Sequence, residues 1–154
     1  MPVETLRLRV ASLDDAKRLY DWSVALSPDA PTPWGQPDWF EHLQWLELAL
    51  GPTDQLIFVG EAIRTDQAIG AVRFDLIAPG RRSVNIVVAP EYRGRGWSRK
   101  LLQAGLDHFQ DGTVLAQVDL ADPAALALFV NAGFVPVSQT SARKLLSLTL
   151  KPET

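Results

Sequence analysis

The residue types best suited to chemistry gather in one short stretch, Arg93-Gly94-Arg95-Gly96-Trp97-Ser98. The stretch follows an apolar segment that ends at Pro90 and precedes a pattern typical of an amphipathic helix. A sharp turn into a helix leaves the first backbone N–H groups unpaired, with the positive end of the helix dipole behind them. Glycines permit the turn and let a ligand approach the backbone, and arginines donate charge-assisted hydrogen bonds to phosphate oxygens. The stretch therefore predicts a phosphate-binding loop.

Two common phosphate-binding motifs do not fit this loop. The chain contains no Walker pattern G-x-x-x-x-G-K-[ST], and a dinucleotide pattern G-x-G-x-x-G would need glycine where Arg99 stands.

Local charge nevertheless supports an anion site. The formal net charge is -3, yet residues 81–100 hold six of the 15 lysines and arginines. A solvated basic face is the alternative explanation of this cluster.

The composition excludes several classes of protein. At 154 residues the chain is long enough for one domain, residues 1–154, with a core of its own. The absence of cysteine excludes disulfides, thiolate metal sites and an acyl-cysteine intermediate, and two histidines are too few for the usual metal cluster. The acidic balance argues against nucleic acid as a partner. No run approaches the ~18 apolar residues of a membrane span and no signal peptide opens the sequence, so we expect a cytoplasmic protein.

The spacing of apolar residues predicts a mixed α/β (α+β) chain with the order β-α-α-β-β-β-α-β-α-β-β. Asp38 followed by Glu41, and Asp122 followed by Pro123, are typical helix starts. Between the first two helices, residues 27–37 hold four prolines and one glycine, which predicts a loop. The predicted strands are 6–10, 55–63, 68–77, 83–88, 114–119, 134–138 and 143–150.

Residues 84–109 resemble the signature of the Gcn5-related N-acetyltransferases, in which Q/R-x-x-G-x-G/A follows a strand ending in an apolar-x-Pro-x-Tyr run. Ser98 replaces the usual final Gly or Ala. Residues 121–134 are similar to that family's N-x-x-A-x-x-L-Y-x-x-x-G-F segment, but Asp122 replaces the Asn and Phe129 replaces the Tyr that often protonates the leaving thiolate. The resemblance implies a central, mostly antiparallel mixed sheet of about seven strands flanked by four helices, with a splayed pair of strands forming an acetyl-CoA cleft.

The same resemblance implies a cosubstrate and its contacts. Acetyl-CoA would be the acyl donor, with no metal, and the loop would hold its pyrophosphate. The backbone N–H of Val88 would bond the thioester carbonyl oxygen, an electrostatic contribution that is large in a dry site. Because the chain lacks cysteine, the amine is expected to attack directly in a ternary complex. The residues assigned to the coenzyme are Ile86, Val87, Val88, Arg93, Gly94, Arg95, Gly96, Trp97, Ser98 and Phe129.

The general base has two candidates. Asp75 is the first, at the end of a predicted strand, and His42 is the second. Each has a structural alternative: Asp75 would pair with Arg73 or Arg81 or cap a turn, and His42 would be a helix-surface histidine. The sequence leaves these alternatives open.

Residues 22–45 are expected to contact the acceptor, because four of the five tryptophans lie there. Trp39 falls on the predicted buried face of the second helix, whereas His42 and Trp45 fall on its flank. Trp34 lies in the proline-rich loop, where packing explains a large aromatic less easily. A packed lid without ligand contact is the alternative. The residues assigned to the acceptor are Trp34, His42, Trp45, Arg73 and Asn85.

A narrower resemblance concerns the strings Glu41-His42-x-x-Trp45-Leu46 and Gly70-x-x-Arg73-Phe74-Asp75. They are similar to acetyltransferases that act on nucleotide-linked amino sugars, as in pseudaminic acid synthesis, which implies a 4-amino-sugar on UDP as acceptor. Three classes stay open: a small-molecule N-acetyltransferase, a protein or peptide N-acetyltransferase, and a non-catalytic acyl-CoA-binding module, which the Phe129 replacement keeps open. We expect a small-molecule amine as partner and no membrane, and a homodimer is compatible with the sequence.

Overall fold

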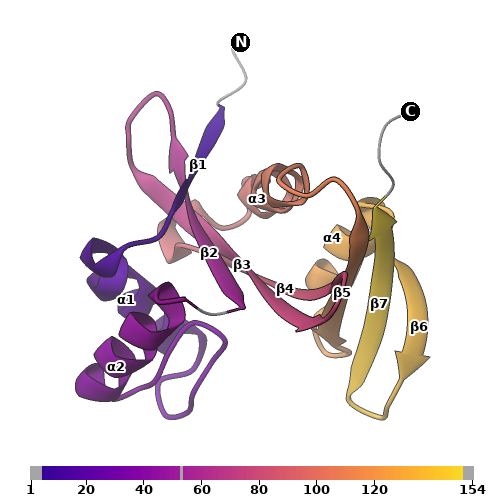
Figure 1. The fold of residues 1–154 in the computed structure, drawn as a ribbon, viewed down its shortest axis with the longest axis horizontal. Helices are drawn as coiled ribbons and strands as arrows, with labels where there is room; N and C mark the ends of the chain where they lie inside the picture. Colours follow the sequence, from indigo (N-terminus) through magenta and orange to yellow (C-terminus); the bar gives the residue numbers. More distant parts are fainter. Residues whose placement is uncertain (1–4, 53, 151–154) are drawn as a thin grey trace.

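The computed structural model describes residues 5–52 and 54–150, which form a single seven-stranded sheet with helices on both faces (Figure 1). The strands lie in the order β1-β2-β3-β4-β5-β7-β6, and every neighbouring pair is antiparallel except β4 and β5. The strands are β1 Leu6–Val10, β2 Gln55–Ala62, β3 Ala68–Ala78, β4 Arg81–Val88, β5 Gly112–Asp119, β6 Val135–Gln139 and β7 Arg143–Leu150; the helices are α1 Ala16–Leu26, α2 Trp39–Leu50, α3 Trp97–Leu106 and α4 Pro123–Asn131. The predicted mixed sheet with four helices is confirmed.

Local signals account for where the helices begin. Asp38 accepts a hydrogen bond from the Glu41 backbone N–H at 3.0 Å, which caps α2. Asp122 accepts from the Ala125 N–H at 3.1 Å at the start of α4, and Pro123 occupies the first turn, where its missing N–H costs nothing. The predicted helix starts are therefore correct.

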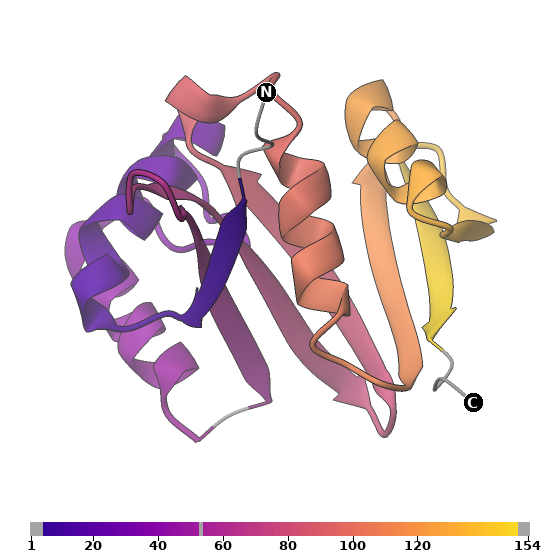
Figure 2. The ribbon, with the colours of Figure 1, turned by 90° about the horizontal axis from the view of Figure 1, so that it is seen from above.

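The helices divide the core into two layers. Helices α1 and α2 cover one face of β1–β4, and α3 and α4 lie on the other face (Figures 1 and 2). Leu19 of α1 and Leu46 of α2, both fully buried, pack with Val59 and Ala71 of the sheet. Because side chains alternate along a strand, neighbouring positions of β3 and β4 contribute to opposite layers.

The sheet opens between β4 and β5. These strands pair only where Arg81, Arg82 and Ser83 lie beside residues 113–115, and beyond Ser83 they run apart (Figure 2). Within residues 5–52 and 54–150, this splayed parallel pair leaves one edge of β4 without a partner strand. This is the opening that the family resemblance predicts, and it defines the site described next.

Candidate active site

A cleft of about 350 Å³ fills the space where β4 and β5 separate. Strand β4 supplies one wall, and β5 with the first turns of α4 supplies the other. Leu26, the last residue of α1, also reaches it from the opposite face of the sheet, so the cleft opens toward both layers. Its lining includes Val84, Asn85, Ile86, Val87, Val88, Arg93, Ser98, Gln117, Asp119, Asp122, Leu128 and Phe129.

The hydrogen-bonding phase of β4 decides which backbone groups face the cleft. The Ala89 N–H donates to the Ile69 carbonyl at 2.8 Å, and Val88 lies opposite Gly70 in the antiparallel register. In such a ladder, hydrogen-bonded and non-hydrogen-bonded pairs alternate. Val87 therefore bonds β3, whereas the N–H groups of Ile86 and Val88 point to the other edge, toward the splay. The Val88 carbonyl on that edge accepts a 3.2 Å bond from Arg93 Nε.

The loop after β4 has the conformation that a phosphate cradle requires. Gly94 and Gly96 have φ of 76° and 83°, the left-handed region that favours glycine. Gly96 is the N-cap of α3 and its cap position makes no side-chain hydrogen bond, which leaves the first-turn N–H groups available to a ligand. A Cβ built on either glycine meets nothing within 4 Å, so the space beside the backbone is open. The loop residues fit a diphosphate.

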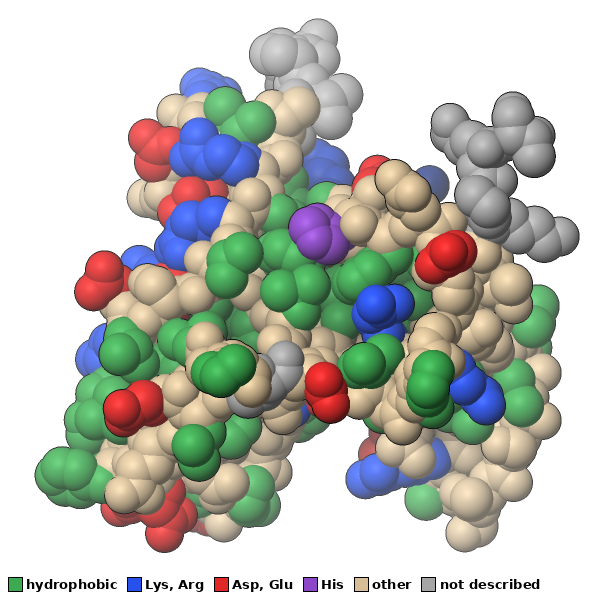
Figure 3. Space-filling view, viewed as in Figure 1, with side chains coloured by type: hydrophobic (Ala, Val, Ile, Leu, Met, Phe, Trp, Pro, Cys, Tyr) green, Lys and Arg blue, Asp and Glu red, His purple; other side chains and the backbone are tan. Residues whose placement is uncertain are grey.

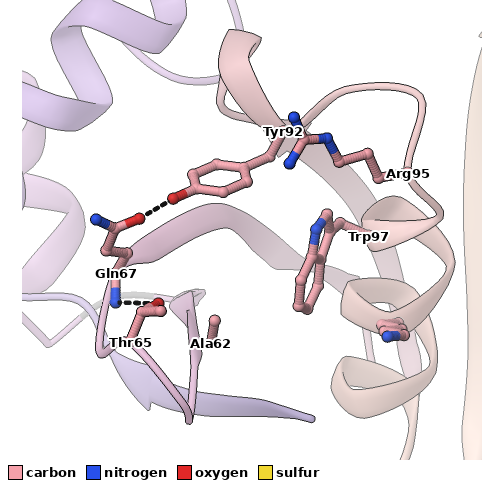
Figure 4. A pocket seen from close by; sticks show the side chains of 7 residues that line it. Ala62, Thr65, Gln67, Tyr92, Arg95 and Trp97 are labelled. Atoms are coloured by element: carbon pink, nitrogen blue, oxygen red, sulfur yellow. Dashed lines mark hydrogen bonds between the residues drawn. The ribbon is translucent and has the colours of Figure 1, made fainter. Parts of the chain in front are cut away.

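The side chains of the loop point in two directions. Arg93 and Ser98 line the cleft. Arg95 and Trp97 turn to the other side of α3, where they line a separate pocket (Figure 4). Trp97 is only 5% exposed and packs with Ala62 and Ile69. Arg95 and Trp97, which the resemblance assigned to the coenzyme, therefore direct their side chains away from the cleft, and only their backbone groups belong to the loop that borders it.

Phe129 lies in the cleft, as the resemblance implies. It is 7% exposed and packs edge-to-face against Phe134, with ring centroids 5.2 Å apart. It carries no hydroxyl, and the two tyrosines of the chain bond elsewhere, Tyr20 to the Pro37 carbonyl and Tyr92 to Gln67. Among the described residues that line the cleft, none is a tyrosine that could protonate a leaving group.

Arg73 and Asp75 form an ion pair beside the cleft. Arg73 Nε donates to Asp75 Oδ1 at 2.8 Å, and Arg73 also donates to the Pro33 carbonyl of the proline-rich loop. The Arg73 guanidinium lies 5.5 Å from the Trp45 ring centroid. In the β3–β4 register Arg73 lies opposite Asn85, so both side chains stand on the face of the sheet that α1 and α2 cover. Four of the predicted residues therefore converge on this face.

Asp75 lies in a second cavity on that face, of about 480 Å³, with Trp45, Asp54 and Leu76 among its lining residues. In Figure 3 the surface is hollowed between the α1–α2 side and the β6–β7 side of the molecule. A ligand can therefore approach β4 from the face opposite α3.

His42 and Trp34 are buried instead of facing either cavity. His42 is 0% exposed, and its Nε2 lies 2.8 Å from the Ala16 carbonyl, to which it donates because a carbonyl oxygen can only accept. Burial lowers the pKa of His42, and its Nδ1 has no hydrogen-bond partner within the described part of the chain. Trp34 is 1% exposed in the α1–α2 core. The sequence placed His42 on a flank of α2, but α1 and the proline-rich loop cover that flank and put it at the centre of the buried face.

Comparison with known proteins identifies the class of enzyme. The model of the acetyltransferase (GNAT) family matches residues 17–134. The chain belongs to this family of acetyltransferases, EC 2.3.1.-, and membership implies acetyl-CoA as cosubstrate. A comparison with curated protein sequences finds no match.

Solved structures with the same fold include spermidine N-acetyltransferase SpeG of Vibrio cholerae. One single-site mutant of that enzyme is 19% identical with TM-score 0.80, covering 94% of this chain and 94% of that one. A dodecameric form in an intermediate state is 18% identical with TM-score 0.80 and the same coverage. A chimera of SpeG and hSSAT is 20% identical with TM-score 0.80, covering 94% and 95%. At this identity the likeness establishes the fold.

Within residues 5–52 and 54–150, none of the helices has the length and apolar character needed to cross a bilayer.

Proposed function

We propose that this chain transfers the acetyl group of acetyl-CoA to a primary amine of a small molecule, by direct attack in a ternary complex. One observation carries the proposal: in the described part of the chain, the edge of β4 beyond Ser83 has no partner strand and faces a cleft that reaches both sides of the sheet. A coenzyme on the α3 side and an amine on the α1–α2 side can therefore meet at the same strand. The absence of cysteine leaves no covalent acyl-thiol route.

The coenzyme contacts follow from which groups point into the cleft. Arg93, Ser98 and the free N–H groups around Gly94 and Gly96 would hold the pyrophosphate. Acetyl-CoA supplies the activated thioester. The Val88 N–H would polarise its carbonyl, with the Ile86 N–H pointing to the same edge. Phe129 would contact the coenzyme through its side chain, and Arg95 and Trp97 only through their backbone. Val87 borders the cleft, but its side chain packs in the α1–α2 layer.

We assign proton removal from the amine to Asp75 through a chain of water molecules, because Asp75 lies opposite Ser83 whereas Val88 lies opposite Gly70, five residues further along the strands. One carboxylate oxygen bonds Arg73, which fixes the orientation of the carboxylate. Its side chain is 24% exposed, so solvent and substrate can reach it. His42 and Trp34, by contrast, have a packing role in this proposal, because their side chains have almost no exposed surface. Trp45, Arg73 and Asn85 remain the acceptor contacts.

A small acceptor is favoured over a protein because the proline-rich loop is tied down. Arg73 bonds the Pro33 carbonyl, and Trp34 anchors the loop in the core. Within the two strings similar to amino-sugar acetyltransferases, Arg73 contacts both Trp45 and Asp75. This supports an amino sugar carried on a nucleotide as the first acceptor to test. The fold likeness to spermidine N-acetyltransferases makes a polyamine the second.

The test is release of coenzyme A thiol with three amines: a UDP-linked 4-amino-sugar, spermidine, and a peptide with a free N-terminus. We expect turnover with one of the small amines and not with the peptide. Turnover with the peptide alone would contradict a small-molecule acceptor.

Phe129 stands where the family commonly has a tyrosine. The missing hydroxyl favours a second candidate function, a module that binds acyl-CoA without catalysis. Calorimetric binding of acetyl-CoA together with no thiol release across a broad amine panel would select it.

A further inference from the structure

A separate pocket lies beside α3, on the side away from the coenzyme cleft (Figure 4). It has a volume of about 240 Å³ and lies between the start of α3 and the turn that joins β2 to β3. Figure 4 shows Tyr92 and Trp97 as two of its walls, with Gln67 and Thr65 across from them. The seven lining residues are Ala62, Thr65, Gln67, Tyr92, Arg95, Trp97 and Lys100. The reaction proposed above uses none of these side chains.

Among the described residues, the lining carries two cationic side chains and no carboxylate. Arg95 is exposed, forms no ion pair within the described residues, and lies 6.0 Å from the Tyr92 ring centroid. Lys100 Nζ lies 4.6 Å from the Trp97 ring centroid. Cations over aromatic faces are favourable and keep their hydrogen-bonding groups directed outward. The pocket therefore combines positive charge with aromatic walls.

The neighbouring cavity has the opposite character. Tyr92 and Gln67 line both cavities and are hydrogen bonded to each other, so together they form the partition. Beyond them the lining includes three carboxylates, Asp21, Asp66 and Glu91, and one cation, Arg18. The change from acidic to basic lining across one hydrogen bond indicates that the pocket at Arg95 favours an anion, whereas its neighbour does not.

We propose that this pocket is a second ligand site, distinct from the acetyl-CoA cleft, for a small aromatic anion of the nucleoside monophosphate class. Arg95 would bond the phosphate, and a planar ring would lie against Tyr92 and Trp97. The Thr65 hydroxyl and the Gln67 amide lie where they could bond the ring edge. The volume of about 240 Å³ lies below the roughly 300–1,000 Å³ of typical ligand pockets, so part of the nucleotide would project into solvent.

Calorimetric titration of adenosine 5′-monophosphate into the full chain, without and with saturating acetyl-CoA, tests the site. We expect the monophosphate to bind in both conditions and at least tenfold more tightly than inorganic phosphate, because the ring adds stacking. Arg95→Ala should weaken its binding about tenfold or more, the size of one lost charge-assisted bond. Gln67→Glu, which places a carboxylate in the lining, should do the same.

Arg99→Ala is the matched control, because Arg99 is an exposed arginine of the same segment that does not line the pocket. It should leave binding of the monophosphate unchanged. Three outcomes would overturn the proposal: no binding at millimolar concentration, displacement by acetyl-CoA, or equal losses in Arg95→Ala and Arg99→Ala. Because this site is assayed by binding of the monophosphate and acetyl transfer by thiol release, failure of the proposed acetyl transfer would appear separately.

Discussion

Arg73 and Asp75 stand two residues apart on β3 and are joined by a 2.8 Å hydrogen bond on the face of the sheet that α1 and α2 cover. The same guanidinium bonds the Pro33 carbonyl and faces the Trp45 ring. One side chain thus connects the proline-rich loop, helix α2 and the proposed base. Since Arg73 is only 10% exposed, these contacts are sheltered from water and constrain where the carboxylate points.

If Asp75 accepts the proton of the amine, removing its charge should slow catalysis without harming coenzyme binding. We expect Asp75→Asn to lower kcat about 100-fold or more and to remove the low-pH limb of the pH–rate profile. Asp54→Asn, in the same cavity, is the control and should keep that limb. The measurement is steady-state kinetics of both variants across the acidic and neutral pH range. An unaltered pH–rate profile in Asp75→Asn would rule out this role.

The glycines of the loop should matter for coenzyme affinity more than for folding. Gly94→Val and Gly96→Val place a side chain where φ is positive and the open space is proposed to hold phosphate. We expect each to weaken acetyl-CoA binding at least about tenfold in calorimetry. Gly80→Val is the matched control, since Gly80 has φ of 71° with nothing within 4 Å but lies in the β3–β4 turn. Like Gly94→Val and Gly96→Val, Gly80→Val should lower the free energy of unfolding by ~1–2 kcal/mol, but it should leave the affinity for acetyl-CoA unchanged.

Phe129 offers a gain-of-function test. Phe129→Tyr adds a hydroxyl at the position where the family resemblance implies the acid that protonates the thiolate, so we expect kcat to rise about tenfold. The buried hydroxyl should also cost ~1–2 kcal/mol of stability. Phe134→Tyr, its 2% exposed neighbour, should be destabilising without the rate gain. Equal rates in both variants would show that protonation of the thiolate does not limit turnover.

His42 should make stability depend on pH. Burial lowers the pKa of His42 below its usual 6.5, so the unfolded chain binds the proton more readily than the folded one. Stability is therefore complete above pH 6.5 and falls as the pH drops below it, by at most ~1.4 kcal/mol per pH unit.

Denaturant unfolding at about pH 7.5 and about pH 5.5, on either side of the ordinary histidine pKa, measures this loss. His42→Gln should reduce the difference in the free energy of unfolding between the two pH values. The control is His108→Gln, because His108 is exposed. A wild-type protein that is equally stable at both pH values would contradict the expectation.

Short-range patterns were sufficient for the elements and for the glycine turn after β4. Asp38 and Asp122 cap helices through bonds that span three residues, and the two glycines set the turn by their own φ angles. Such signals depend on neighbours in the chain, so the sequence contains them in full. The splay of β4 from β5 was accessible only through resemblance, because it depends on strands that are distant in sequence.

By itself, then, the sequence determined the order of the elements, the position of the loop and the absence of a thiol nucleophile. Tertiary structure alone decided which way the side chains face. The side chains of Arg95 and Trp97 point away from the cleft that Arg93 lines, because the chain turns at Gly94 and again at Gly96. His42 is buried because α1 supplies the Ala16 carbonyl and the proline-rich loop closes over it. The exposure of a side chain depends on segments that pack against it from elsewhere in the chain, and helical or strand periodicity carries no record of them.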